Sequence, residues 1–234
     1  MTNDPHLTPV AFGPEHAATY DSNFAGLSAI KEAIHLVMRA HFSALPDDAR
    51  ILVAGAGTSA EVRHLAAQFP SWQFTLADPS SAMLDIARTH AETEGFIDRC
   101  KFHADFVSTL KDGDFDGATS LLVSHFLRQT RERTDYFRSI YERLKPGARI
   151  LNVDLCADTD TADFPSLMSL WKELLTLNGI SETAIATYQT AYGRDFACHG
   201  PADVAAMIEA AGFDRPVQCF QTALMRGWIT NRQR

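Results

Sequence analysis

The residues best suited to chemistry form a glycine-rich turn that is followed, at the end of the next predicted strand, by an aspartate. The turn is Gly55-Ala56-Gly57, which follows the apolar run at 51–53, and the aspartate is Asp78. Glycines between a strand and a helix let a ligand approach backbone N–H groups that point outward. An acid at the tip of the following strand can accept hydrogen bonds from both hydroxyls of a ribose. The pattern therefore predicts a nucleoside-binding βαβ unit.

A second group of polar residues follows the strand predicted at 118–123. Ser124 and His125 come first, and Arg128 lies one helical turn further on. Histidine has an unperturbed pKa of about 6.5, which suits a general base at neutral pH; the alternative is a helix-start histidine that is bonded to backbone. Arg128 could bind a substrate carboxylate through paired donors, or it could be a solvated helix arginine. Both choices stay open on the sequence alone.

The elements that position these residues alternate between strands and helices. Helices are predicted at 60–69, from 80 to 88 and at 134–144, and strands at 72–76, 100–104, 118–123 and 149–153. This rhythm indicates an α/β fold with a doubly wound, Rossmann-like parallel sheet. Two terminal strands, 216–220 and 223–230, are predicted to form an antiparallel hairpin, which gives a seven-stranded sheet with an antiparallel last strand.

The remaining segments are predicted to surround this sheet within a single domain that spans residues 1–234. Residues 1–45 form an N-terminal helical arm, 51–155 the cofactor-binding core, 156–200 a helical cap insertion, and 201–234 the C-terminal helix and hairpin. For 156–200, a peripheral hairpin that extends the core is an equal alternative. Loops and insertions over such an edge commonly contact substrate. The cap supplies four candidates for substrate binding: Tyr188, Tyr192, Arg194 and His199.

Composition limits the classes of function. The chain has 234 residues, of which 46% are hydrophobic and 21% charged, and its net charge of −8 argues against a nucleic-acid partner. The four cysteines form no CxxC pair, so neither a metal site nor a disulfide framework is predicted. No apolar run approaches the length of a membrane span, and no signal-peptide core is found in residues 1–20. We therefore expect a cytoplasmic protein with reduced thiols and no membrane partner.

Five short motifs occur in a fixed order along the chain: Gly55-Ala56-Gly57-Thr58, Asp78-Pro79-Ser80-Ser81-Ala82-Met83-Leu84, Asp105-Phe106, Leu144-Lys145-Pro146-Gly147 and Ala210-Ala211-Gly212-Phe213. Over roughly residues 12–232 this order resembles that of the class I S-adenosylmethionine-dependent methyltransferases. Within that family, Tyr20-Asp21 and Gly227-Trp228-Ile229 are most similar to small-molecule members and to the carboxy-S-adenosylmethionine synthases of tRNA modification.

The resemblance implies S-adenosyl-L-methionine as the cofactor and S-adenosyl-L-homocysteine as its product. A methyl group would move by in-line displacement to a small, carboxylate-bearing acceptor, with much of the rate coming from alignment and from exclusion of water. In the family, the glycines approach the methionine moiety, the acid after the second strand binds the ribose, and Asp105 and Phe106 would hold the adenine. The cofactor-binding residues that it implies are Tyr20, Gly55, Ala56, Gly57, Asp78, Pro79, Met83, Asp105, Phe106 and Ser124.

Two departures from the family pattern keep other functions in view. Val53 stands where the first motif has an acid, and Ser59 stands where it has a third glycine; Tyr20 is the candidate to support the methionine end instead. A carboxy-S-adenosylmethionine synthase is one alternative, with Arg194 in the region of that enzyme's additional arginine. An NAD-dependent oxidoreductase is another, because Gly55-x-Gly57-x-x-Ala60 followed by an acid also fits the dinucleotide pattern. A catalytically inactive cofactor-binding protein is the third, and a homodimer remains open.

Overall fold

The computed structural model describes residues 13–15, 17, 27–180, 185 and 199–234. In this part of the chain the strands are β1 (Arg50–Ala54), β2 (Gln73–Ala77), β3 (Cys100–His103), β4 (Phe115–Leu121), β5 (Leu144–Leu155), β6 (Val217–Thr222) and β7 (Met225–Asn231). The α-helices that the structure bounds are α2 (Ser28–Phe42), α3 (Ala60–Gln68), α4 (Ser81–Thr93), α5 (Thr130–Tyr141), α6 (Phe164–Leu177) and α8 (Pro201–Ala210). Short 3₁₀ helices are η3 (Ile97–Arg99), η4 (Val107–Thr109) and η5 (Ser124–Phe126).

The strands of the described residues form one seven-stranded sheet in the order β3-β2-β1-β4-β5-β7-β6. β1 to β5 pair in parallel, and β7 pairs antiparallel with both β5 and β6. The predicted doubly wound, Rossmann-like sheet with an antiparallel last strand is therefore confirmed. The strand order reverses between β1 and β4, and in open α/β sheets ligands bind outside the carboxyl ends of the strands at such a reversal.

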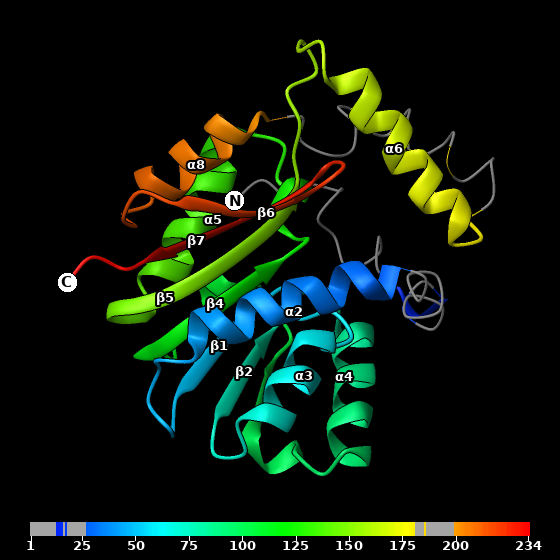
Figure 1. The fold of residues 1–234 in the computed structure, drawn as a ribbon. Helices are drawn as coiled ribbons and strands as arrows, with labels where there is room; N and C mark the ends of the chain where they lie inside the picture. Colours follow the sequence, from blue (N-terminus) through cyan, green and yellow to red (C-terminus); the bar gives the residue numbers. More distant parts are fainter. Residues whose placement is uncertain (1–12, 16, 18–26, 181–184, 186–198) are drawn as a thin grey trace.

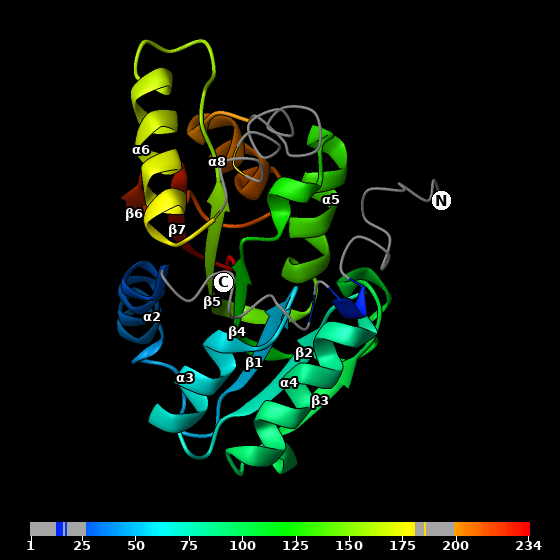
Figure 2. The same ribbon diagram turned by 90° about the vertical axis from the view of Figure 1, so that its right-hand side faces the viewer.

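Two apolar clusters cover the two faces of the sheet, and β1 contributes to both because side chains alternate along a strand. Ile51 and Val53 join the cluster on the face of α2, α3 and α4, whereas Leu52 and Ala54 join the cluster on the face of α5 and α8. Figures 1 and 2 show these two helical layers on opposite sides of the sheet. This double burial explains why β1 reads as a continuous apolar run.

Several element boundaries differ from the predictions: α4 ends at Thr93 rather than at 88, and β4 spans Phe115–Leu121 rather than 118–123. α5 begins at Thr130 rather than at 134, and β5 begins at Leu144, so that the predicted stop Lys145-Pro146-Gly147 lies inside the strand. These residues are held by neighbouring strands: Lys145 Nζ contacts Asp116 Oδ1 at 2.7 Å, and the Gly147 N–H donates to the carbonyl of Arg232 at 2.9 Å. A register shift between β4 and β5 accommodates the extra residues.

α6 is the helix that the structure bounds within the predicted cap at 156–200. Its buried residues Met168, Trp171 and Leu175 belong to the same apolar cluster as the turn between β6 and β7. Residues 181–184 and 186–198 of that segment, with Tyr188, Tyr192 and Arg194, lie outside the described residues, as does Tyr20 in the arm. Among the described residues, no helix combines the length and the apolar character that a membrane span requires.

Candidate functional site

The glycine turn between β1 and α3 depends on left-handed backbone conformations. Gly55, Gly57 and Ser59 have φ values of +74°, +49° and +69°. A Cβ atom on Gly55 would lie 2.3 Å from Cγ2 of Val123, so this glycine lets the turn pack against the segment that follows β4. A Cβ atom on Gly57 would meet nothing within 4 Å. The turn is therefore fixed on one side and faces open space at its second glycine.

Asp78, at the carboxyl end of β2, holds this turn in place. Its Oδ2 accepts the Gly57 N–H at 2.9 Å, and its Oδ1 accepts the Ser80 N–H at 2.8 Å. Burial raises the pKa of Asp78, and these two hydrogen bonds oppose that effect. Each carboxylate oxygen has a further lone pair, so the group can still accept hydrogen bonds from a ligand such as a ribose. Ser80 caps α4 by accepting the Met83 N–H.

Glu61 is a site residue that sequence reasoning missed. It lies in the first turn of α3 and is only 6% exposed. Burial, with a smaller contribution from the nearby Asp78, raises its pKa to about 7. No ion pair among the described residues involves Glu61 or Asp78. The glycine turn thus lies beside two buried carboxyl groups, and neither forms an ion pair with a cationic side chain of the described residues.

This buried carboxyl group gives the protein a pH-dependent stability. An acid whose pKa rises on folding retains its proton in the native state, so its stability contribution is full below its ordinary pKa of 4.5 and is lost as the pH rises through about 7. We expect Glu61→Gln to unfold with a free energy up to about 3 kcal/mol higher than the wild type at pH 8, and with nearly the wild-type value at pH 4. Urea unfolding at the two pH values measures this difference.

The exposed Glu92 of α4 provides the control, because Glu92→Gln removes the same charge without a buried group. That variant should follow the wild type at both pH values. A Glu61→Gln effect of equal size at pH 4 and pH 8 would contradict the assignment of a buried, titrating carboxyl group.

The other predicted cofactor residues lie at the same edge of the sheet. Asp105 follows β3, which is the neighbour of β2, and its Oδ1 accepts the Phe106 N–H at 2.7 Å. Phe106 is 43% exposed, which is unusual for a phenylalanine and leaves its ring accessible. Ala56 and Met83 are buried, and Pro79 is half-buried.

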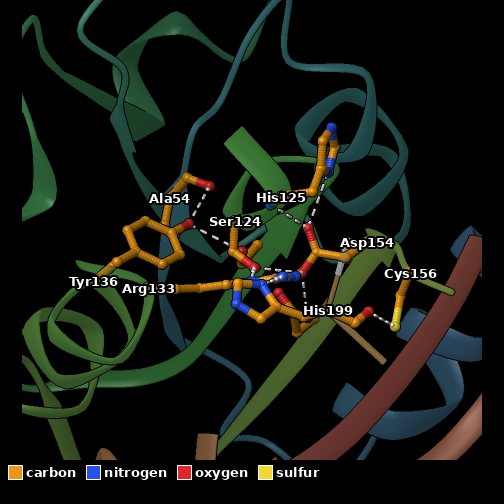
Figure 3. Close-up of polar contacts among 10 residues, drawn as sticks. Ala54, Ser124, His125, Arg133, Tyr136, Asp154, Cys156 and His199 are labelled. Carbon is orange, nitrogen blue, oxygen red and sulfur yellow. Dashed lines mark hydrogen bonds and ion pairs between the residues drawn. The ribbon is translucent and has the colours of Figure 1, made fainter. Parts of the chain in front are cut away.

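A second group of polar residues is centred on Asp154, near the end of β5. Asp154 has no exposed surface, and its Oδ2 accepts hydrogen bonds from Ser124 Oγ at 2.5 Å and Asn152 Nδ2 at 2.8 Å. Arg133 Nη2 lies 3.0 Å from the same oxygen and forms an ion pair with it. Figure 3 shows Ser124, His125 and Arg133 around this carboxylate. Burial alone would raise the pKa of Asp154, but Arg133, His125 and Ser124 hold it well below its usual range. Asp154 is therefore ionised at neutral pH.

His125 occupies the other oxygen of this carboxylate. Its backbone N–H and its ring Nδ1 lie 3.0 and 3.1 Å from Asp154 Oδ1. Burial lowers the pKa of His125 more than Asp154 raises it, so the ring is neutral. Because an ionised carboxylate can only accept, Nδ1 must carry the proton and Nε2 must carry the lone pair. This is the tautomer that a general base needs.

Tyr136 of α5 joins the two groups. Its hydroxyl lies 2.9 Å from Ser120 Oγ in β4 and 3.3 Å from the carbonyl oxygen of Ala54, the residue before the glycine turn. Its ring is drawn between these elements and Arg133 in Figure 3. Burial raises the pKa of this phenol, so it stays protonated and can donate. Tyr136 thereby links the end of β1 to β4, the strand that precedes His125.

The structure brings some predicted residues together and separates others. Gly55, Gly57 and Asp78 form one group, whereas Ser124 and His125 belong to the Asp154 group, where the Ser124 hydroxyl also accepts from Arg133 Nε at 2.7 Å. Arg128 is exposed, and the His199 ring contacts Thr130 and Arg133. Sequence reasoning missed Glu61, Arg133 and Asp154. An acid near the end of an apolar strand was the available signal for Asp154; Arg133 has no local signal.

Comparisons with known proteins agree with this geometry. Residues 52–150 match the family model described as a methyltransferase domain. No curated protein is a significant match to the sequence. An O-methyltransferase family protein from Burkholderia thailandensis is 14% identical, with a TM-score of 0.69 over 93% of this chain and 60% of that one. An O-methyltransferase family 2 protein from Planctomyces limnophilus, in complex with apigenin, is 17% identical, with a TM-score of 0.60 over 91% of this chain and 61% of that one. PigF with SAH is 16% identical, with a TM-score of 0.66 over 94% of this chain and 60% of that one.

This chain spans about three fifths of the length of those three proteins, and at these identities the likeness concerns the fold. The match to the methyltransferase domain runs from residue 52 in β1 to residue 150 in β5. It therefore includes the glycine turn, Asp78, Ser124, His125 and Arg133, but not Asn152, Asp154 or His199. Residues 52–150 are therefore similar to a methyltransferase domain, and the chain as a whole has the Rossmann-like fold of these solved structures.

Proposed function

We propose that this protein transfers a methyl group from S-adenosylmethionine to a small acceptor, with His125 as the general base when the acceptor arrives protonated. The observation that carries the proposal is the contact between the two groups of site residues. The glycine turn packs against Val123, which lies two positions before His125, and Tyr136 bonds to both adjoining strands. A cofactor seated on the turn would therefore lie beside the candidate base.

The residues present fit this cofactor. Gly57 offers open backbone, Asp78 offers acceptor capacity for ribose hydroxyls, and Asp105 with the exposed Phe106 ring offers a place for the adenine. The two buried carboxyl groups, Glu61 and Asp78, favour a ligand with positive charge, such as an ammonium or a sulfonium, over the pyrophosphate of NAD. When bound, S-adenosylmethionine supplies a methyl group on a sulfonium whose leaving group departs neutral.

The chain's own residues then supply positioning and proton transfer. Asp154 holds the Nδ1 proton of His125, so Nε2 carries the lone pair with which His125 would take a proton from a hydroxyl acceptor. An acceptor of this kind agrees with the neighbours named as O-methyltransferases and with the apigenin found in one of them. The prediction that Arg128 lies one helical turn beyond His125 was wrong, because η5 ends at Phe126 and α5 begins at Thr130. We further propose that Arg128, exposed in the loop between them, binds the carboxylate that the acceptor carries.

Calorimetric titration with S-adenosylmethionine, S-adenosylhomocysteine and NAD in parallel tests the cofactor. We expect binding of the first two in the micromolar range and none of NAD. Binding of NAD alone would replace the methyltransferase proposal with the oxidoreductase alternative. Cofactor binding without transfer to any acceptor in a screen of small hydroxylated acids would favour the inactive binding protein.

A substitution of Asp78 localises the cofactor. Asp78→Ala removes the acceptor for the Gly57 N–H and for the ribose, so we expect S-adenosylmethionine to bind more than tenfold more weakly, a loss of roughly 1.5–3 kcal/mol. Calorimetry measures the affinity, and circular dichroism confirms the fold of the variant.

Asp116 is a matched control, because it is also a buried aspartate that accepts a backbone N–H, from Arg50 at 2.9 Å, but it lies at the opposite edge of the sheet. Asp116→Asn should cost stability and leave cofactor affinity unchanged. Unchanged affinity in a folded Asp78→Ala protein would refute the cofactor site.

A further inference from the structure

His199 is held by the protein at three points. It lies just before α8, and its ring Nδ1 is 3.3 Å from a terminal guanidinium nitrogen of Arg133, while its Nε2 is 3.3 Å from Thr130 Oγ1. Its carbonyl oxygen accepts from the thiol of Cys156 at 3.1 Å. Figure 3 shows the ring beside the guanidinium of Arg133. Both ring nitrogens thus face polar groups of the chain itself.

The hydrogen-bonding chemistry of Arg133 and Thr130 determines the tautomer of the His199 ring. A guanidinium only donates, so Nδ1 of His199 must be an unprotonated acceptor and the proton must sit on Nε2, from which it is donated to Thr130. Burial and the adjacent Arg133 lower the pKa of His199, whereas Asp203 at the start of α8 raises it. The neutral ring therefore completes the contacts of Arg133.

Arg133 uses the rest of its guanidinium to hold the group around Asp154. Nε donates to Ser124 Oγ at 2.7 Å, and a terminal nitrogen lies 3.0 Å from Asp154 Oδ2. The guanidinium is planar and the side chain is fully buried, so these contacts share one rigid orientation with the His199 contact. Loss of the contact between His199 and the Arg133 guanidinium should therefore also change the orientation of the guanidinium relative to Asp154.

We propose that His199 is a positioning residue for the candidate base: it orients the Arg133 guanidinium, which sets the position of Asp154 and, through Asp154, the tautomer of the His125 ring. The catalytic role of this series of contacts rests on the proposed function, in which His125 removes a proton. The coupling itself is a property of the folded protein and is measurable without turnover. This places His199 among the residues that prepare the base, in addition to any contact with substrate.

Nitrogen NMR of protein labelled with ¹⁵N-histidine tests the coupling directly. The ring shifts of His125 report its tautomer and its pKa, and its signals are assigned from a His125→Gln variant. Arg133 acts to lower the pKa of His125, so freeing the guanidinium in His199→Ala should raise the His125 pKa by about half a unit or more. The groups that face His199 in the described chain are Arg133, Asp203, Thr130 and the Cys156 thiol, and none of them is altered by this substitution.

His199→Asn is the decisive companion variant. Its side-chain oxygen can accept from Arg133 where Nδ1 did, so the His125 shifts should return to the wild-type values. His64→Asn in α3, remote from this group, is the control and should leave them unchanged. Identical His125 shifts in the wild type and His199→Ala, or no recovery in His199→Asn, would overturn the proposal.

The wild-type protein gives a second readout that does not depend on how the variants fold. As the pH falls, the His125 shifts should change in step with the protonation of His199, and a His125 response independent of it would also overturn the proposal. Calorimetry with S-adenosylmethionine on the same samples separates the two proposals. Absence of cofactor binding would refute the proposed function and leave the NMR coupling standing.

Discussion

Replacement of Arg133 with methionine is expected to lower the free energy of unfolding by about 3–5 kcal/mol, because it leaves the charge of Asp154 buried without its counter-ion. Arg133 and Asp154 have no exposed surface, so water cannot take over the lost contacts. Methionine fills a similar volume, which limits the contribution from a cavity. Urea unfolding followed by tryptophan fluorescence or circular dichroism measures the loss.

A double-mutant cycle separates the uncompensated charge from lost packing. Arg133→Met combined with Asp154→Asn removes both charges, and we expect it to recover a large part of the lost stability. Arg131 is the matched control: it lies on the same helix, in an exposed pair with Asp135 at 3.8 Å, and Arg131→Met should change the stability by less than about 1 kcal/mol. If Arg131→Met and Arg133→Met lowered the free energy of unfolding equally, the buried ion pair would stabilise the protein no more than the exposed one.

Replacement of His125 with alanine is expected to lower turnover by about 10²- to 10⁴-fold, the usual contribution of a general base. Cofactor affinity should stay within a few-fold of the wild type, because the glycine turn and Asp78 are untouched. The measurement is the rate of S-adenosylhomocysteine formation with an acceptor from the screen, at saturating cofactor and over a range of pH. The wild-type rate should fall as the pH drops through the pKa of His125, and the variant should lose that dependence.

Arg128→Ala is the comparison for this prediction. As a carboxylate-binding residue, Arg128 should affect the KM for the acceptor more than kcat, whereas His125→Ala should affect kcat. If His125→Ala turned over at the wild-type rate, the general-base role would be wrong. The hydrogen bond from His125 to Asp154 would then have a structural role only.

Local patterns were sufficient to predict the framework of the proposed cofactor site. β1, the glycine turn, α3 and Asp78 are consecutive in the chain, so spacing alone places the turn against the acid, and the Gly57–Asp78 hydrogen bond shows that arrangement. The parallel sheet and its antiparallel hairpin were equally readable, because each strand has its own apolar run and its own turn residues. The extent of pairing between strands was harder to predict from sequence. β5 begins as early as Leu144 because Lys145 and Gly147 bond to Asp116 and Arg232, which are distant in the sequence.

The group around Asp154 could be predicted only in part, since it is assembled from four distant segments. Ser124 and His125 follow β4, Arg133 is on α5, Asp154 ends β5 and His199 precedes α8. Arg133 reads in the sequence as one more charged residue of a polar helix, and only the packing of α5 on the sheet turns it inward. Glu61 was missed for a similar reason, because an acid in the first turn of a helix ordinarily faces solvent.

The burial of the Arg133–Asp154 pair also determines how the protein should respond to ionic strength. Dissolved ions screen charges that they can approach, with a Debye length of about 8 Å at physiological salt, but they cannot enter a pair with no exposed surface. The association of a cationic cofactor with a protein of net charge −8 is open to such screening. We therefore expect added salt to weaken cofactor capture while leaving the protonation state of His125 unchanged.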